Sequence, residues 1–144
     1  MLLIIATTFV LYSAFFIGWQ VSRSVPDEVP RATRYVDNAI DALLIITIGT
    51  AIYTTGNAWL AIGISAAIIA LRAITHIDAL RAPLSGIACG VALYNAAITP
   101  VILCLVLNYL IGTRAKKSKS LFFASIAQPA LAIITAAIAI YAFN

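Results

Sequence analysis

Apolar residues along this chain fall into five long stretches that are separated by short polar segments. A helix needs about 20 mostly apolar residues to cross the hydrocarbon core of a bilayer, with a lower limit of about 17. The pattern therefore predicts an all-α, polytopic integral membrane protein, a bundle of about five transmembrane helices that forms one domain over residues 1–144. The predicted spans cover about residues 1–20, 38–55, 58–74, 85–111 and 121–143.

Turn-forming residues mark the connections between these spans. Pro26 and Pro30 are expected to break any helix in the first polar segment, because proline lacks a backbone N–H. Gly56 and Asn57 form a turn pair between two stretches that are near the lower length limit, which predicts a helical hairpin. Pro83 is expected to end the loop that follows the third stretch.

The fourth stretch, residues 85–111, contains Pro100 near its middle. We interpret it as one kinked span, because neighbouring helices can satisfy the backbone groups that a proline frees. The alternative is four spans plus a re-entrant segment at residues 95–100, which would gather all the positive loops on one side. With five spans, five Lys and Arg residues lie on one side and four on the other, so the positive-inside rule gives no clear orientation.

Composition strengthens the membrane assignment. Of the 144 residues, 63% are apolar and only 10% are charged, and the mean hydropathy is +1.05. A soluble domain carries about 25% charged residues, so this chain has too few charges to cover a surface in water. The expected partner is a lipid bilayer, in a bacterial or archaeal cytoplasmic membrane or in an organellar or viral membrane. Nucleic acid is not expected to bind, because the net charge of +4 comes largely from one loop.

Small residues at a spacing of four predict where helices pack closely. In lipid, helices associate through close backbone approach and dispersion rather than through a hydrophobic driving force. Gly86 and Gly90 form a GxxxG pattern, and Gly63 forms a similar pair with Ala67. These faces are expected to contact other helices, either within a copy of this chain or in other membrane subunits.

The polar loop after the third stretch holds the first candidate site, which consists of Arg72, His76, Asp78 and Arg81. His76 is the one histidine of the chain, and a histidine with a pKa of about 6.5 could relay protons. The favoured interpretation is different: Arg72 extends from the helix end toward the headgroups, and the other side chains lie in interfacial water. The reason is that a proton relay needs ionisable groups deep within the spans.

Asp41, near the start of the second stretch, is the second candidate. A carboxylate at this depth is costly unless it is paired or hydrated. It could bind a cation or a proton, or it could pair with Arg34, Arg72 or Arg81, and pairing is the favoured interpretation. Uncharged polar residues within the spans are expected to form hydrogen bonds between helices, with pore lining as the alternative. They are Asn95, Thr99, Asn108 and Gln128.

Other chemistry is not indicated. Cys89 and Cys104 would lie about 22 Å apart on one continuous helix, too far for a disulfide. One histidine and two buried cysteines do not form a metal set, and no cofactor is expected. The chain contains no GxSxG, HExxH or phosphate-binding glycine loop, so we do not expect an enzyme. The loop near residue 115 is expected to face lipid headgroups through four basic residues. They are Arg114, Lys116, Lys117 and Lys119.

Three functions remain open on this basis. The favoured one is a small non-catalytic accessory or structural subunit that packs its alanine and glycine faces against other membrane subunits. The second is a holin-like protein that associates with copies of itself to form a membrane pore. The third is a small proton- or ion-coupled transporter that uses Asp41 or the group of Arg72, His76, Asp78 and Arg81.

Overall fold

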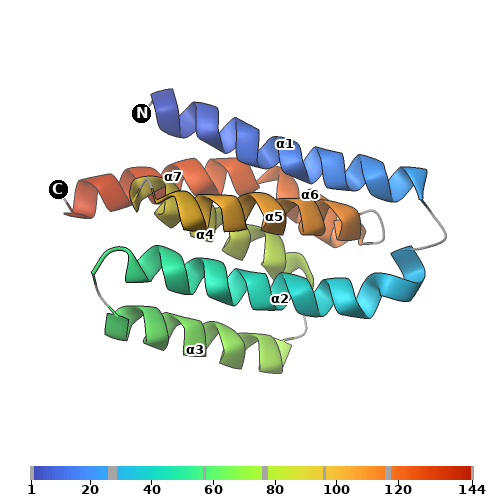
Figure 1. Cartoon of the computed structure of the whole chain (residues 1–144), viewed down its shortest axis with the longest axis horizontal. Coiled ribbons are helices and arrows are strands. Elements are labelled where there is room, and N and C mark those ends of the chain that lie inside the picture. The colour runs from blue at the N-terminus through green and yellow to red at the C-terminus, as the bar shows by residue number, and fades with distance from the viewer. Residues whose placement is uncertain are drawn as a thin grey trace.

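The computed structural model describes residues 2–25, 29–56, 58–75, 78–95, 97–115 and 118–143, and every regular element among them is helical. This confirms the all-α class. The elements are α1 (Leu2–Ser24), α2 (Val29–Tyr53), α3 (Ala58–Thr75), the short 3-10 helix η1 (Asp78–Leu80), α4 (Arg81–Asn95), α5 (Ile98–Ala115), α6 (Lys119–Ile126) and α7 (Gln128–Phe143). The long helices lie side by side along one axis (Figure 1).

Three of these helices are long and apolar enough to cross a membrane: α1, the part of α2 from Thr33 to Tyr53, and α5. The pair α6 and α7 adds a fourth if the two count as one span, although they are bent by 43° where they meet. The apolar part of α3, Ala58–Leu71, is shorter. Many large apolar side chains of these helices are exposed, such as Phe9 at 67% and Ile102 at 56%, as expected for a lipid-facing surface.

The region 85–111 differs from the single kinked span that we predicted. The helix α4 ends at Asn95 and α5 begins at Ile98. Arg81 at the start of α4 and Arg114 near the end of α5 both bind Asp37, so α5 runs antiparallel to α4. At the other end of α4, the Asn95 side chain donates a hydrogen bond to the Ala51 carbonyl near the end of α2. The chain reverses at the place that the alternative prediction gave, near residues 95–100.

Four prolines among the described residues lie near the start of a helix, and one of them, Pro129, directly follows the 43° bend between α6 and α7. Pro30, Pro83, Pro100 and Pro129 all lie in the first turn of a helix. A proline is tolerated there because its missing N–H would have no partner within the helix. This explains why α2 begins at Val29, well before the predicted start, and why Pro100 follows a chain reversal instead of bending a continuous helix.

Glycines hold two pairs of parallel helices at close range. Gly18 of α1 lies against the Tyr109 carbonyl of α5, and Gly112 of α5 lies against the Phe15 carbonyl of α1, so that a methyl group at either glycine would overlap the facing backbone. The helix α4 meets α7 in the same way: a Cβ at Gly90 would lie 2.6 Å from the Ala132 carbonyl oxygen. Close backbone approach of this kind is a main source of helix association in lipid.

The helix α3 lies at the edge of the bundle, beside α2 (Figure 1). Gly49 of α2 and Ser65 of α3 lie at this contact, where a Cβ at Gly49 would be 3.1 Å from the Ser65 hydroxyl oxygen. On the opposite face of α3, Trp59 is 84% exposed, and no atom of a described residue lies within 4 Å of a Cβ built at Gly63. Most of the α3 surface is therefore available to lipid or to another protein.

The helix ends that flank the charged segments of the sequence lie at one end of the bundle, which we call the charged end. All nine Lys and Arg and all five Asp and Glu residues fall within residues 23–41, 72–81 and 114–119. These windows cover the end of α1 and start of α2, the end of α3 and start of α4, and the end of α5 and start of α6. The α2–α3 turn and the α4–α5 turn lie at the opposite end, together with the two chain termini (Figure 1).

Candidate functional site

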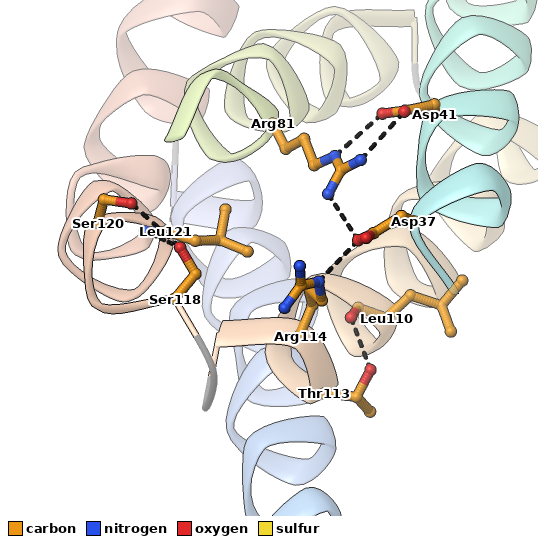
Figure 2. Close-up of polar contacts among 9 residues, drawn as sticks. All are labelled: Asp37, Asp41, Arg81, Leu110, Thr113, Arg114, Ser118, Ser120 and Leu121. Carbon is orange, nitrogen blue, oxygen red and sulfur yellow. Dashed lines mark hydrogen bonds and ion pairs between the residues drawn. The ribbon is translucent and has the colours of Figure 1, made fainter. Parts of the chain in front are cut away.

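Four charged side chains from three helices meet at the charged end, and we call them the ion-pair cluster: Asp37, Asp41, Arg81 and Arg114 (Figure 2). Arg81 donates from Nε and Nη2 to the two carboxylate oxygens of Asp41, at 3.0 and 3.1 Å. Its Nη1 donates to Asp37 at 2.7 Å. Arg114 donates from Nε to the same Asp37 oxygen, also at 2.7 Å. Asp37 therefore bridges two arginines, and Arg81 bridges two carboxylates.

The cluster is electrically balanced and mostly withdrawn from solvent. Arg81 is only 3% exposed and Arg114 is 14% exposed, whereas Asp37 and Asp41 are 22% and 28% exposed. A buried guanidinium needs such partners, because an uncompensated charge in a low-dielectric interior is strongly unfavourable. The bidentate contact with Asp41 uses the planar fork of the guanidinium, which fixes distance and orientation together. The cluster thus ties α2 to the start of α4 and to the end of α5.

The positions of these four residues within their helices bring the side chains to the same level of the bundle. Asp37 and Asp41 are one helical turn apart on α2, so both carboxylates lie on one face. Arg81 is the first residue of α4, and Arg114 lies in the last turn of α5. Just beyond it, the Ser118 side chain accepts a hydrogen bond from the Leu121 backbone N–H and caps α6 (Figure 2).

Three polar residues form a second group in the interior, which we call the polar core: Ser85, Asn108 and Gln128. Their exposed fractions are 0%, 2% and 2%. The Ser85 hydroxyl donates to Asn108 Oδ1 at 3.0 Å, and Gln128 Nε2 donates to both Ser85 Oγ and Asn108 Oδ1. Asn108 Nδ2 donates to the Leu11 carbonyl at 3.2 Å. The polar core therefore joins α4, α5 and α7 to one another and to α1.

The α4–α5 hairpin also changes the position of the two cysteines. On one continuous helix they would be far apart, but here Cys89 and Cys104 belong to the same buried cluster, on the two helices of the hairpin. Both are buried and free. Asn108 Nδ2 adds a weak contact to Cys89 Sγ at 3.8 Å. Within the described part of the chain, no three His, Cys, Asp or Glu side chains come together as a metal site would need.

The structure describes only part of the first candidate site, the group around His76. His76 lies outside the residues that the structure describes, as do the side chains of Arg72 and Asp78. Arg81 belongs to the ion-pair cluster, where it binds Asp41, one of the pairings that we expected. Arg34 is exposed on α2.

The basic loop is divided between interior and surface. Arg114 turns inward to Asp37, which differs from its expected place at the headgroups, whereas Lys119 is exposed. Lys116 and Lys117 lie outside the described residues.

The small-residue pairs have different surroundings. Gly86 lies against α7, where a Cβ would be 2.9 Å from the Gln128 carbonyl oxygen, and Gly90 packs on the next turn of the same helix. Gly63 and Ala67 instead lie on the exposed face of α3. Sequence reasoning did not single out the contacting glycines Gly18 and Gly112, which are isolated in sequence and become a pair only when α1 packs against α5.

The uncharged polar residues that we expected to bond between helices have two different environments. Asn95, Asn108 and Gln128 bond between helices, whereas Thr99 is exposed at the start of α5.

Comparisons of the chain with protein-family models, with curated proteins and with solved structures give no match. The functional argument therefore rests on the geometry of this chain.

Proposed function

We propose that this protein is a small, non-catalytic subunit of a membrane assembly and that α3 is the helix through which it binds its neighbours. The observation that carries this proposal is the face of α3 that points away from α2. At 100° per residue, the part of this face over residues 59–70 consists of small residues with one tryptophan at its end, and all of them are exposed. They are Trp59, Gly63, Ala66, Ala67 and Ala70.

The small side chains on this face suit close packing against a second helix. An isolated lipid-facing helix gains nothing from glycine and alanine on its outer surface, because large apolar side chains interact with lipid equally well. Small side chains let a second helix approach closely enough for backbone contacts, as α1 and α5 do within this chain. Beside this face, an apolar groove of about 530 Å³ runs between α2 and α3, with Gly49, Ala61 and Ala66 on its walls. The groove can receive larger side chains from a partner helix.

Site-directed photo-crosslinking tests the proposal. A photoreactive amino acid at Gly63 should form a discrete adduct with another membrane protein in native membranes, identifiable by mass spectrometry. The change Ala67→Leu should abolish the adduct, because it fills the face without touching the interior of the chain. Ala6→Leu on the exposed surface of α1 is the matched control, and it should leave the adduct unchanged.

The outcomes separate the remaining interpretations. Adducts with lipid alone would contradict the subunit proposal. Adducts only between copies of this chain would favour self-association of the holin-like type, and expression alone should then collapse the membrane potential.

The distribution of charge supports an orientation. Lys and Arg are retained on the cytoplasmic side of membrane proteins, and here all of them lie within the three windows that the fold gathers at the charged end. We propose that the charged end faces the cytoplasm. Trp19 lies near this end, with the Arg23 guanidinium 4.8 Å from its ring centre, and Trp59 lies near the other. Tryptophans at both ends suit the two interfaces of a bilayer.

Ion- or proton-coupled transport is a second candidate, and one observation favours it. Ser85 follows Arg81 by one turn of α4, so polar groups continue from the ion-pair cluster into the polar core. In proteoliposomes that contain the purified protein, Asp41→Asn should then abolish proton flux, with Arg34→Gln as a surface control. Equal flux in the wild-type protein and in protein-free liposomes would exclude proton transport.

A further inference from the structure

Gln128 lies where α6 meets α7, and its neighbours fix which way its buried amide points. Asn108 Nδ2 donates to the Leu11 carbonyl, which is only an acceptor. The other end of that amide, Asn108 Oδ1, is therefore directed toward Ser85 and Gln128 and needs donors. The Ser85 hydroxyl supplies one, and Gln128 Nε2 supplies the other.

This arrangement leaves one atom without a partner. Both hydrogens of Gln128 Nε2 are used, one by Asn108 Oδ1 and one by Ser85 Oγ. Gln128 Oε1 is buried and accepts no hydrogen bond from any described residue. Turning the amide over would place Oε1 against Asn108 Oδ1, and two acceptors would then face each other. The orphaned acceptor is a consequence of the whole network, starting at the Leu11 carbonyl.

A small cavity adjoins this amide. It has a volume of about 10 Å³, and Thr8, Cys89, Asn108 and Gln128 are among the residues on its wall. A space of about one probe sphere can hold a single water molecule when two or more polar atoms face it. Thr8 Oγ1 donates its own hydrogen to the Ile4 carbonyl at 2.7 Å, so it still has lone pairs that can accept from a water.

We propose that this cavity binds one water molecule, which donates hydrogen bonds to Gln128 Oε1 and to Thr8 Oγ1. The water completes the polar core and connects α1 to the bend between α6 and α7. Its ligand chemistry is that of a neutral donor the size of a single oxygen atom, because the unsatisfied atom, Gln128 Oε1, is an acceptor and no carboxylate lies on the wall. This inference does not depend on the proposed role of α3.

A crystal structure from a lipidic phase at about 2 Å or better resolution tests the proposal. The expected result is one density peak within hydrogen-bonding distance of both Gln128 Oε1 and Thr8 Oγ1. The peak should disappear in Thr8→Val, which keeps the shape of the side chain and removes the acceptor. It should persist in Thr7→Val, the matched change at a half-buried threonine that also bonds to the backbone of its own helix.

Solution NMR in nanodiscs provides a second measurement that does not need crystals. A water-to-protein nuclear Overhauser effect is expected at the Gln128 side-chain amide, and it should be lost in Thr8→Val and retained in Thr7→Val. An empty cavity beside a well-ordered Gln128 would overturn the proposal. So would a heavier cation at the peak, revealed by anomalous scattering from rubidium-soaked crystals.

Discussion

Arg81 and Asp41 are 40 positions apart in the sequence, yet Arg81 donates to both carboxylate oxygens of Asp41, at 3.0 and 3.1 Å. The contact crosses from α2 to the first residue of α4. Arg81 also binds Asp37, which in turn binds Arg114 near the end of α5. One arginine therefore links three helices at the charged end.

Replacing Arg81 with methionine should destabilise the fold, because it leaves two carboxylates without their main partner. Breaking a fully buried ion pair costs about 3–5 kcal/mol. The carboxylates here are 22% and 28% exposed, so solvent screening reduces the expected loss to about 2–3 kcal/mol. Thermal unfolding in a mild detergent measures the effect. Arg34→Met on the exposed face of α2 should change stability little, and equal losses for both variants would contradict the role of the cluster.

Gly112→Ala should separate α1 from α5. The added methyl group would overlap the Phe15 carbonyl, and overpacking of this kind costs about 1–3 kcal/mol. Gly63→Ala is the control, because in the described part of the chain nothing lies within 4 Å of a Cβ at that position. Unfolding of both variants by the same method gives the comparison. If Gly63→Ala proves as harmful as Gly112→Ala, the close approach of α1 and α5 is not a major source of stability.

Asn108→Ala should cost more than Asn95→Ala. Asn108 takes part in three hydrogen bonds with oxygen or nitrogen partners, and Asn95 donates one, to the Ala51 carbonyl. At about 0.6 kcal/mol for each interhelical bond in a membrane protein, the expected losses are about 2 and about 0.6 kcal/mol. Reversible unfolding of the purified variants measures the difference. A larger loss for Asn95→Ala would show that the polar core is not where side-chain bonding matters most.

Cysteine labelling of intact cells tests the α4–α5 reversal. If residues 85–111 crossed as one span, Thr55 and Ser120 would lie on the same side of the membrane. With a hairpin they lie on opposite sides. A membrane-impermeant maleimide should label Thr55→Cys from outside and should label Ser120→Cys only after lysis. Both positions are exposed, whereas the native Cys89 and Cys104 are buried and serve as a silent background. Labelling of both engineered cysteines from one side would contradict the hairpin.

Much of this fold follows from sequence alone, because long apolar stretches in lipid have to become helices. The sequence predicts the reversal inside residues 85–111 only as the alternative, because the stretch has no charge to interrupt it and one kinked span also accommodates Pro100. Two signals were available there. The stretch is longer than one crossing needs, and a proline suits the first turn of a new helix better than the middle of an old one.

The candidate site was predictable in part. The position of Asp41 inside an apolar stretch predicts that its carboxylate is paired, and Arg81 is among the partners expected. Arg114 was missed because it stands beside three lysines in the sequence and was grouped with them. Ser85 was missed because a serine in an apolar helix often bonds to its own backbone. The contacts of Arg114 and Ser85 both depend on the α4–α5 hairpin. Asp37 and Arg114, for example, are 77 positions apart in the sequence and are in contact in the structure.

The position of the charges also has a consequence for biogenesis. Residues 42–71 and 82–113 contain no Asp, Glu, Lys or Arg, and each includes the tip of a helical hairpin. When such a hairpin enters the bilayer, the part that must travel to the far side carries no ionised group, and the costly transfer of a charge through hydrocarbon is avoided. In the proposed orientation, the ion pairs can form afterwards on the cytoplasmic side, where the chain is made.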